Sequence, residues 1–137
     1  MSNQITTGRA RHLVKMHTPK GWKVKMGGSY NRGASGLCAY NLKTIFCPLV
    51  IDDYSLVVFL HEVGHVKLHK PDSDKESHVE EYEAEQFAFA ALRGAGFHVT
   101  REILRSAKDN VRAHILAENA DGVVIDKKIA RWCGHSR

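Results

Sequence analysis

The chain has 137 residues, of which 43% are hydrophobic and 26% are charged, and its formal net charge is +5. This length suits one domain with its own hydrophobic core and is too short for two. No run of 18 apolar residues is present, which excludes a membrane-spanning helix, and the N-terminus has no hydrophobic signal core. We therefore expect a single cytoplasmic domain over residues 1–137, in which the three cysteines are reduced.

A short amphipathic helix is expected near the N-terminus. Ala10, Leu13 and Val14 have the spacing of one helical face, and the helix must end before Pro19. Residues 22–26 then alternate apolar and basic side chains, as an edge strand does. This part of the chain therefore predicts a helix followed by a strand at the edge of a sheet.

Two further strands are predicted at residues 37–40 and 44–47, and a short turn joins them. If that turn has two residues, Cys38 lies opposite Cys47 across the hairpin. Together with the preceding edge strand, the hairpin predicts a short antiparallel sheet.

The helix predicted next carries the sequence H-E-V-G-H at residues 61–65. The apolar run 54–60 before it is typical of a buried helix, and Asp52 and Asp53 are placed to cap its N-terminus. Pro71 stops the helix on the C-terminal side, after several cationic side chains that suit a helix end.

H-E-x-x-H on a helix indicates a zinc hydrolase. His61 and His65 are one turn apart on the same face, so their imidazoles can bind one Zn²⁺ from the same side. Glu62 lies about 100° round the helix from His61, where it can reach a water near the metal and act as a general base. Gly64 is a poor helix residue, and its presence indicates that another backbone comes close at this point.

A catalytic zinc has three protein ligands, so one more is needed. His69 is about 12 Å further along the same helix axis than His61, which is too far to share the ion. We expect it to contact the helix C-terminus or a metal ligand instead. The metzincin class of zinc proteases requires a third histidine at position 71. This position is proline, so the metzincin class is excluded.

The helix predicted to follow Ser77 supplies the candidate carboxylates. Ser77 and Glu80 have the spacing of a capping box, in which the Glu80 side chain folds back on the helix start. Glu81 and Glu85 share a stripe with two alanines, which favours close packing against the H-E-x-x-H helix. We predict Glu81 as the third ligand and Glu85 as an acceptor for an imidazole N–H. Glu83 and Glu85 are the alternative ligands.

Two more helices are predicted in a C-terminal extension, at about residues 97–137. Thr100 can cap the first, and Asp126 can cap a short last helix that runs to Trp132. Basic side chains on the first suit a DNA-binding helix-turn-helix, but the long connection favours packing on the core. The expected fold is therefore an α+β, zincin-like domain. In its core, at about residues 22–96, a short antiparallel sheet packs on the H-E-x-x-H helix and the glutamate-bearing helix.

The segments H-E-V-G-H-V-K-L-H and E-Y-E-A-E-Q-F-A resemble the ImmA/IrrE family of zinc metallopeptidases, whose pattern is H-E-x-G-H-x-x-x-H followed by E-x-E-A-N-x-F-A. The resemblance covers about positions 36–92. It implies that the zinc ligands are His61, His65 and Glu81 and that Glu62 is catalytic. The fifth residue of the second segment is Glu, where the family usually has Asn.

The resemblance implies a zinc-dependent metallopeptidase that cleaves a regulatory protein such as a DNA-binding transcriptional repressor. The charge distribution makes nucleic acid a further candidate partner. Residues 1–51 have eight basic and no acidic side chains, whereas residues 52–92 have three basic and ten acidic ones. The basic end suits a SprT-like protease acting on DNA-bound proteins, which is the first alternative. A non-catalytic interaction protein that keeps its metal for folding is the second.

Hydrolysis of a peptide bond also requires a hydrogen-bond donor that stabilises the negative oxygen of the tetrahedral intermediate. The sequence offers four tyrosine or histidine side chains for this role and no basis for ranking them. They are Tyr30, Tyr40, His78 and His98.

Overall fold

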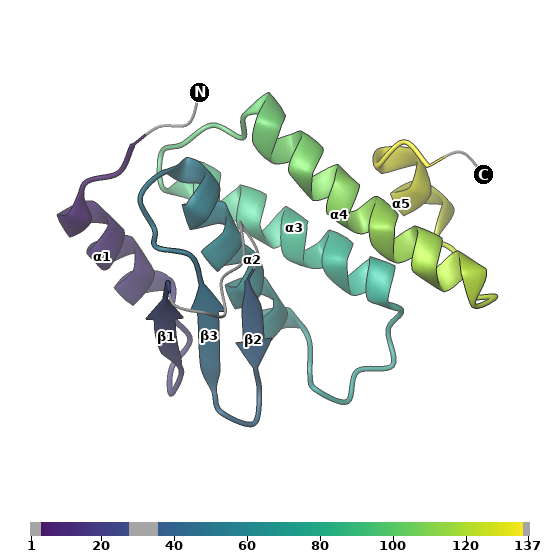
Figure 1. Cartoon of the computed structure of the whole chain (residues 1–137), viewed down its shortest axis with the longest axis horizontal. Helices are drawn as coiled ribbons and strands as arrows, with labels where there is room; N and C mark the ends of the chain where they lie inside the picture. Colours follow the sequence, from purple (N-terminus) through teal and green to yellow (C-terminus); the bar gives the residue numbers. More distant parts are fainter. Residues whose placement is uncertain (1–3, 28–35, 136–137) are drawn as a thin grey trace.

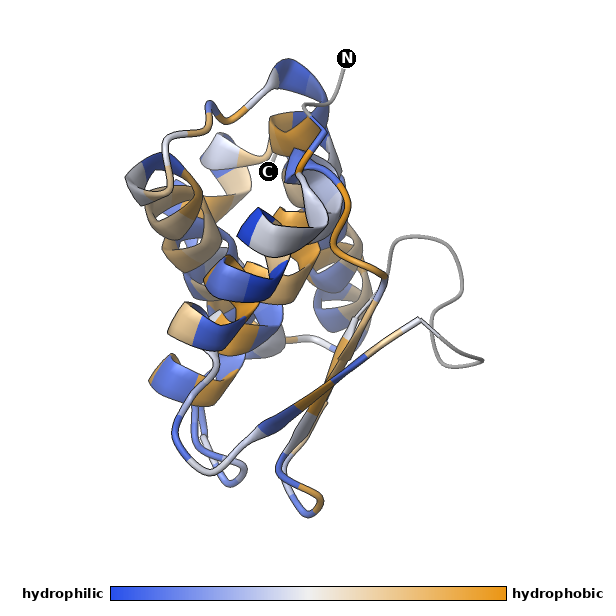
Figure 2. Ribbon diagram, turned by 90° about the vertical axis from the view of Figure 1, so that its left-hand side faces the viewer, coloured by the Kyte–Doolittle hydropathy of each residue, from blue (hydrophilic) through white to orange (hydrophobic). Residues whose placement is uncertain are grey.

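The computed structural model describes residues 4–27 and 36–135, which form five helices and one three-stranded sheet (Figure 1). In chain order the elements are α1 (Thr7–His17), β1 (Lys23–Met26), β2 (Leu37–Ala39), β3 (Thr44–Cys47), α2 (Asp53–Leu68), α3 (Ser77–Gly94), α4 (Arg101–Ala120) and α5 (Lys127–Trp132). The helices lie on one face of the sheet (Figure 2). The predicted α+β class is confirmed, and none of the helices described is long and apolar enough to cross a membrane.

The sheet has the strand order β1-β3-β2, so β3 is central. β2 pairs antiparallel with β3, as predicted for a hairpin, but β1 pairs parallel with β3. The prediction of a fully antiparallel sheet was therefore wrong. The direction of a strand depends on where the connecting chain re-enters the sheet, and the residues of the strand itself do not encode that. The predicted edge position of residues 22–26 is confirmed.

The turn between β2 and β3 sets the register of the hairpin. It spans residues 40–43 and places Lys43 at a φ of 47°. Cys38 therefore pairs with Ile45, and Cys47 lies further along β3. Cys38 was expected to face Cys47 only across a turn of two residues, and the observed turn is two residues longer, so the two cysteines are not paired. The cysteines are free, as expected.

α2 forms the centre of the hydrophobic core. Asp52 caps it by accepting a hydrogen bond from the Ser55 N–H at 2.8 Å, and Ser55 Oγ accepts one from the Asp52 N–H at 3.1 Å. The predicted cap at Asp52 is confirmed, whereas Asp53 is the first helical residue and is fully buried. The helix ends at Leu68, ahead of Pro71. Four large apolar side chains of α2 are completely buried: Leu56, Phe59, Leu60 and Val63.

α3 packs closely against α2 at Gly64. A side-chain carbon at this position would lie 3.2 Å from Ala84 Cα and 3.1 Å from Phe87 Cδ1. Ala84 and Ala88 are fully buried in the core. The close approach predicted from Gly64 and from the alanine stripe is therefore confirmed, and it sets the spacing between the two helices that carry the candidate ligands.

The N-terminus of α3 is capped by a residue of α4. The backbone N–H groups of Ser77 and His78 donate to the Glu118 carboxylate at 2.9 and 2.8 Å, and His78 Nδ1 lies 2.7 Å from Glu118 Oε1. The predicted capping box between Ser77 and Glu80 was wrong, since the residue at the cap position, Glu76, makes no side-chain cap hydrogen bond. A capping group some 40 residues away in sequence leaves no local pattern to recognise.

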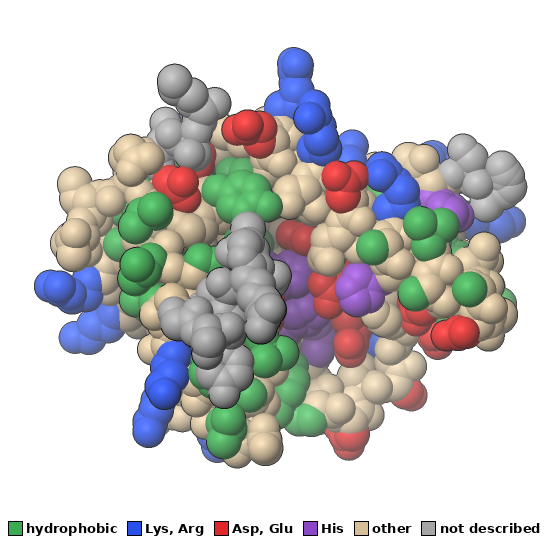
Figure 3. Space-filling model, viewed as in Figure 1, with side chains coloured by type: hydrophobic (Ala, Val, Ile, Leu, Met, Phe, Trp, Pro, Cys, Tyr) green, Lys and Arg blue, Asp and Glu red, His purple; other side chains and the backbone are tan. Residues whose placement is uncertain are grey.

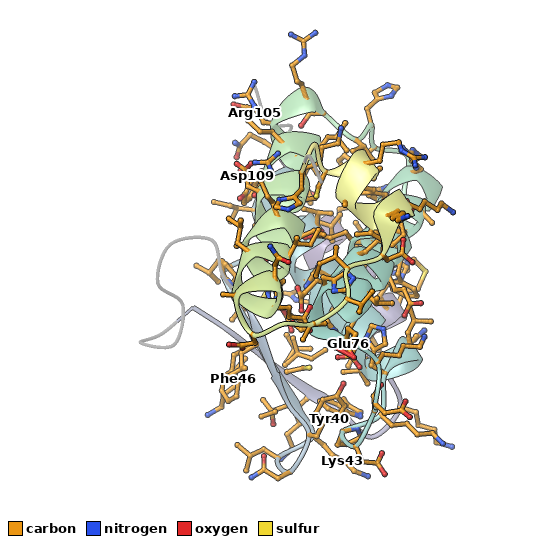
Figure 4. All side chains as sticks on the ribbon, turned by 90° about the vertical axis from the view of Figure 1, so that its right-hand side faces the viewer. Tyr40, Lys43, Phe46, Glu76, Arg105 and Asp109 are labelled. Carbon is orange, nitrogen blue, oxygen red and sulfur yellow. The ribbon has the colours of Figure 1, made fainter. Side chains whose placement is uncertain are left out.

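The C-terminal helices pack on the core, as predicted. α4 buries one face, which consists of Ile103, Ala107, Val111 and Ile115. Arg112 Nε donates to the Cys133 carbonyl at 3.2 Å, and Lys108 Nζ lies 5.7 Å from the centre of the Trp132 ring. These two contacts flank a buried apolar cluster that α4 and α5 share, which includes Val111, Ile115 and Ile129. Arg105 projects from the solvent side of α4 (Figure 4).

Candidate metal centre

α2 places the two histidines of the H-E-x-x-H sequence side by side. His61 Nε2 lies 3.1 Å from His65 Nε2, and the ring centroids are 4.7 Å apart. Both side chains are 12% exposed. They lie in a hollow of the surface where histidine and acidic side chains gather (Figure 3). The predicted shared face of the two imidazoles is confirmed.

α3 brings Glu81 to the same point. Its Oε1 lies 3.0 Å from His61 Nε2, and its Oε2 lies 2.9 Å from His65 Nε2. One ligand atom from each of the three residues can be chosen so that all lie within 4.8 Å of one another. A tetrahedral ion with bonds of about 2.0–2.1 Å holds its ligand atoms about 3.3 Å apart. These three residues could therefore hold a metal ion with only a small outward shift of the side chains.

Asn110 of α4 orients the acidic side of this cluster. Its Nδ2 donates to Glu81 Oε1 at 2.8 Å and to Glu85 Oε2 at 3.2 Å. Sequence analysis missed this residue, because it lies in the C-terminal extension, far in sequence from both motifs. One sequence feature could have indicated it: Asn110 is a polar residue beside the apolar stripe of α4, one turn after the buried Ala107.

Glu85 adjoins the other ring nitrogen of His61. Glu85 Oε1 lies 3.3 Å from His61 Nδ1, so the predicted acceptor is next to the imidazole N–H. The contact is not a well-aligned hydrogen bond, because the buried His61 Nδ1 has no hydrogen-bond partner in the part of the chain that the structure describes. The nearby Glu85 carboxylate nevertheless helps to raise the pKa of His61.

The structure separates the alternative ligands from the metal position. His69 lies at the C-terminal cap of α2, and its Nδ1 is 3.0 Å from His65 Nδ1, so it contacts a candidate ligand. Glu83 Oε1 lies 2.9 Å from His69 Nε2. The group of possible ligands found among residues 4–27 and 36–135 therefore contains none of His69, Glu83 and Glu85.

The charges of the cluster are strongly coupled. Burial lowers the pKa of His61, but the carboxylates of Glu81 and Glu85 outweigh it and hold that pKa well above the usual 6.5. Burial raises the pKa of Glu81, but its hydrogen bonds with His61 and His65 outweigh it and hold that pKa well below its usual range. The cluster therefore favours positive charge at the point between the two helices, which a divalent cation can supply.

Glu62 lies beside the cluster and is 7% exposed. The backbone of Gly36, just before β2, passes so close that a side-chain carbon there would lie 2.9 Å from Glu62 Cγ. Burial raises the pKa of Glu62, although the charges of His61 and His65 oppose this shift. A carboxylate with a raised pKa is a better general base near neutral pH.

A cavity of about 590 Å³ contains these groups, which is within the usual range of about 300–1,000 Å³ for ligand-binding clefts. β2 and the turn after it line one side, and α4 lines another with Asn110 and His114. Cys38 also lines the cavity, where burial, followed by the charge of Glu62, raises its pKa to about 12. Cys38 is therefore a neutral thiol near pH 7, and the thiolate is the form that binds metals.

The four candidate oxyanion donors have different surroundings. Tyr40 lines the cavity at the turn end of the sheet (Figure 4), but its hydroxyl lies 3.0 Å from the carbonyl oxygens of both His65 and His69. His78 is fully buried and hydrogen-bonded to Glu118. His98 is exposed in the connection between α3 and α4. Tyr30 lies outside the described residues.

Comparison with known proteins identifies no relative: no family model, no curated protein and no solved structure matches this chain. The resemblance to the ImmA/IrrE pattern therefore rests on the residues of the two motifs alone. The geometry of the cluster is independent of that resemblance, since it follows from the packing of α2, α3 and α4.

Proposed function

We propose that this chain is a zinc-dependent metallopeptidase with a zincin-like core of the ImmA/IrrE type. The proposal rests on one observation: two imidazoles from α2 and a carboxylate from α3 converge on a single position beside the buried Glu62. Two histidines and a glutamate are a ligand set of catalytic zinc sites, which keep a fourth position open. The cavity at the cluster provides access for a substrate.

The residues of the site have distinct roles in peptide hydrolysis. Zinc, when bound, supplies Lewis-acid polarisation of the scissile carbonyl and of the attacking water. Glu62 takes a proton from that water as the water oxygen bonds to the carbonyl carbon. The Glu62 carboxylic acid then donates the proton to the amide nitrogen as the C–N bond breaks. Asn110 keeps Glu81 facing the two histidines through its hydrogen bond.

The Glu62→Gln variant tests this function. Removing the base should lower the rate of cleavage of a fluorogenic peptide library by about 10²–10⁴-fold, whereas the zinc content should stay at that of the wild type. Glu76→Gln, which removes a carboxylate at the start of α3 without a side-chain cap contact, is the matched control and should cleave normally. Cleavage by Glu62→Gln at the rate of this control would refute the assignment of the base.

The substrate that we propose, a regulatory protein such as a transcriptional repressor, follows from the resemblance. The two alternatives stay predictions with separate outcomes. A SprT-like protease should cleave faster when DNA is added, and the stimulation should fall with salt. A non-catalytic interaction protein should bind zinc in both the wild type and Glu62→Gln but should cleave no peptide.

A further inference from the structure

His69 is a buried histidine with two specific ring contacts and no role in the proposed reaction. It is 4% exposed and lies between His65 and Glu83. His69 Nδ1 is 3.0 Å from His65 Nδ1, and His69 Nε2 is 2.9 Å from Glu83 Oε1. Three side chains from α2 and α3 thus form a continuous chain of contacts that ends on a candidate metal ligand.

Lys75 extends this chain towards the surface. Its Nζ donates to both oxygens of Glu83, at 2.9 and 3.1 Å. Both oxygens of Glu83 thus accept from one ammonium group, in an ion pair that holds Glu83 as a carboxylate. A carboxylate can only accept hydrogen bonds.

The acceptor at one end determines where each proton lies. Because Glu83 only accepts, His69 must carry a proton on Nε2. A neutral imidazole has one N–H, so His69 Nδ1 is an acceptor, and the proton between the two rings belongs to His65 Nδ1. His65 Nε2 is then the ring nitrogen left for a metal, which would replace the proton that this nitrogen donates to Glu81 in the metal-free cluster. It is the atom that faces His61 and Glu81, at 3.1 and 2.9 Å.

From this chain of contacts we infer that Glu83 and His69 are positioning residues, which fix the tautomer and the ring orientation of His65 for metal binding. The inference rests on the proposed metal site but not on peptide cleavage. It also distinguishes the two histidine ligands. His61 Nδ1 has only the poorly aligned contact with Glu85, whereas His65 Nδ1 has a partner that is itself held in place. Hydrogen bonds of this kind to a ligand imidazole raise metal affinity by about 10–100-fold.

Two substitutions at Glu83 and one matched control test the inference. Glu83→Leu removes the acceptor and should weaken zinc binding by about 10–100-fold, as measured by competition with a chromophoric chelator. Glu83→Gln keeps a weaker, uncharged acceptor and should give a smaller loss. Glu76→Gln removes a carboxylate near the start of the same helix outside this chain and should bind zinc as the wild type does. A general effect of charge or folding would not produce this graded order.

Nitrogen NMR of the histidine rings in the zinc-bound protein gives a second readout, which needs no substrate. In the wild type, His69 should carry its proton on Nε2, and its bare Nδ1 should show a coupling to His65 Nδ1 through the hydrogen bond. In Glu83→Leu this coupling should weaken or disappear. A proton on His69 Nδ1 in the wild type would overturn the inference, as would equal zinc affinities of Glu83→Leu and Glu76→Gln. Because both measurements are independent of peptide cleavage, failure of the proposed enzyme function would be recognised separately.

Discussion

The contact at Gly64 gives a direct test of how the two ligand-bearing helices are spaced. In Gly64→Ala, the new methyl carbon would lie 3.1 Å from Phe87 Cδ1 and 3.2 Å from both Cα and O of Ala84. Carbon atoms in ordinary contact are about 3.5–4.0 Å apart. The methyl group is therefore a few tenths of an ångström too close to three atoms, and two of these belong to the backbone of α3. The clash can be relieved only by moving the helix or the Phe87 ring.

Two opposing terms set the size of the effect. Ala is favoured over Gly inside a helix by about 1 kcal/mol, whereas overpacking a dense core costs about 1–3 kcal/mol. We expect Gly64→Ala to be less stable than the wild type by about 1 kcal/mol, the difference between these terms. A shift of α3 also moves Glu81 away from the two histidines, so zinc affinity should fall with stability.

The free energies of unfolding of Gly64→Ala and Gly94→Ala, measured in urea, test this prediction. Gly94 is also helical and in α3, but a side-chain carbon there would meet no atom within 4 Å. Gly94→Ala should therefore gain stability from the higher helix propensity of Ala, without overpacking, and should keep the zinc affinity of the wild type. If Gly64→Ala is as stable as Gly94→Ala and binds zinc equally well, the close approach of α2 and α3 does not position the site.

Two other predictions concern the charges and hydrogen bonds of the cluster. The pKa of His61 in the metal-free protein lies well above its usual value, so zinc binding near neutral pH should displace about one proton, and affinity should fall about tenfold when the pH is lowered by one unit. Isothermal titration calorimetry in buffers of different ionisation enthalpy measures that proton, and binding without proton release would contradict the coupling. Asn110→Ala removes the hydrogen bonds to Glu81 and Glu85 and should weaken zinc binding by about tenfold. Asn119→Ala, at an exposed position of the same helix, is the control, and equal affinities of the two variants would exclude a role for Asn110.

Features that depend on residues a few positions apart could be predicted from the sequence. The spacing of His61 and His65 on one helical turn, the cap at Asp52 and the close approach at Gly64 all follow from local helix geometry, and the structure confirms each of them. Glu81 was also found from its helical stripe, because the small residues on that stripe indicated which face of α3 meets α2. The convergence of these side chains was predictable to the extent that it depends on such local spacing.

Features that depend on contacts between distant segments could not be predicted in this way. The cap of α3 comes from Glu118, and the hydrogen bonds that orient Glu81 come from Asn110, both on a helix that sequence analysis treated as an extension of the core. The parallel pairing of β1 joins Lys23 to Thr44 of β3, far along the chain, and the residues of either strand do not encode its direction. The pairing of Cys38 depends on the length of a turn with weak sequence signals. In each case tertiary packing determines which residue or strand is the contact partner, and a short sequence pattern does not predict it.

X-ray absorption spectroscopy at the zinc edge tests the central claim most directly. With one equivalent of Zn²⁺ bound, His61, His65 and Glu81 should produce a shell of nitrogen and oxygen neighbours at about 2.0–2.1 Å with the scattering pattern of two imidazoles. No sulfur neighbour should appear at about 2.3 Å, because the group of possible ligands in the described part of the chain contains no cysteine. A sulfur shell, a single imidazole or no stoichiometric binding would contradict a metal centre made of these three residues.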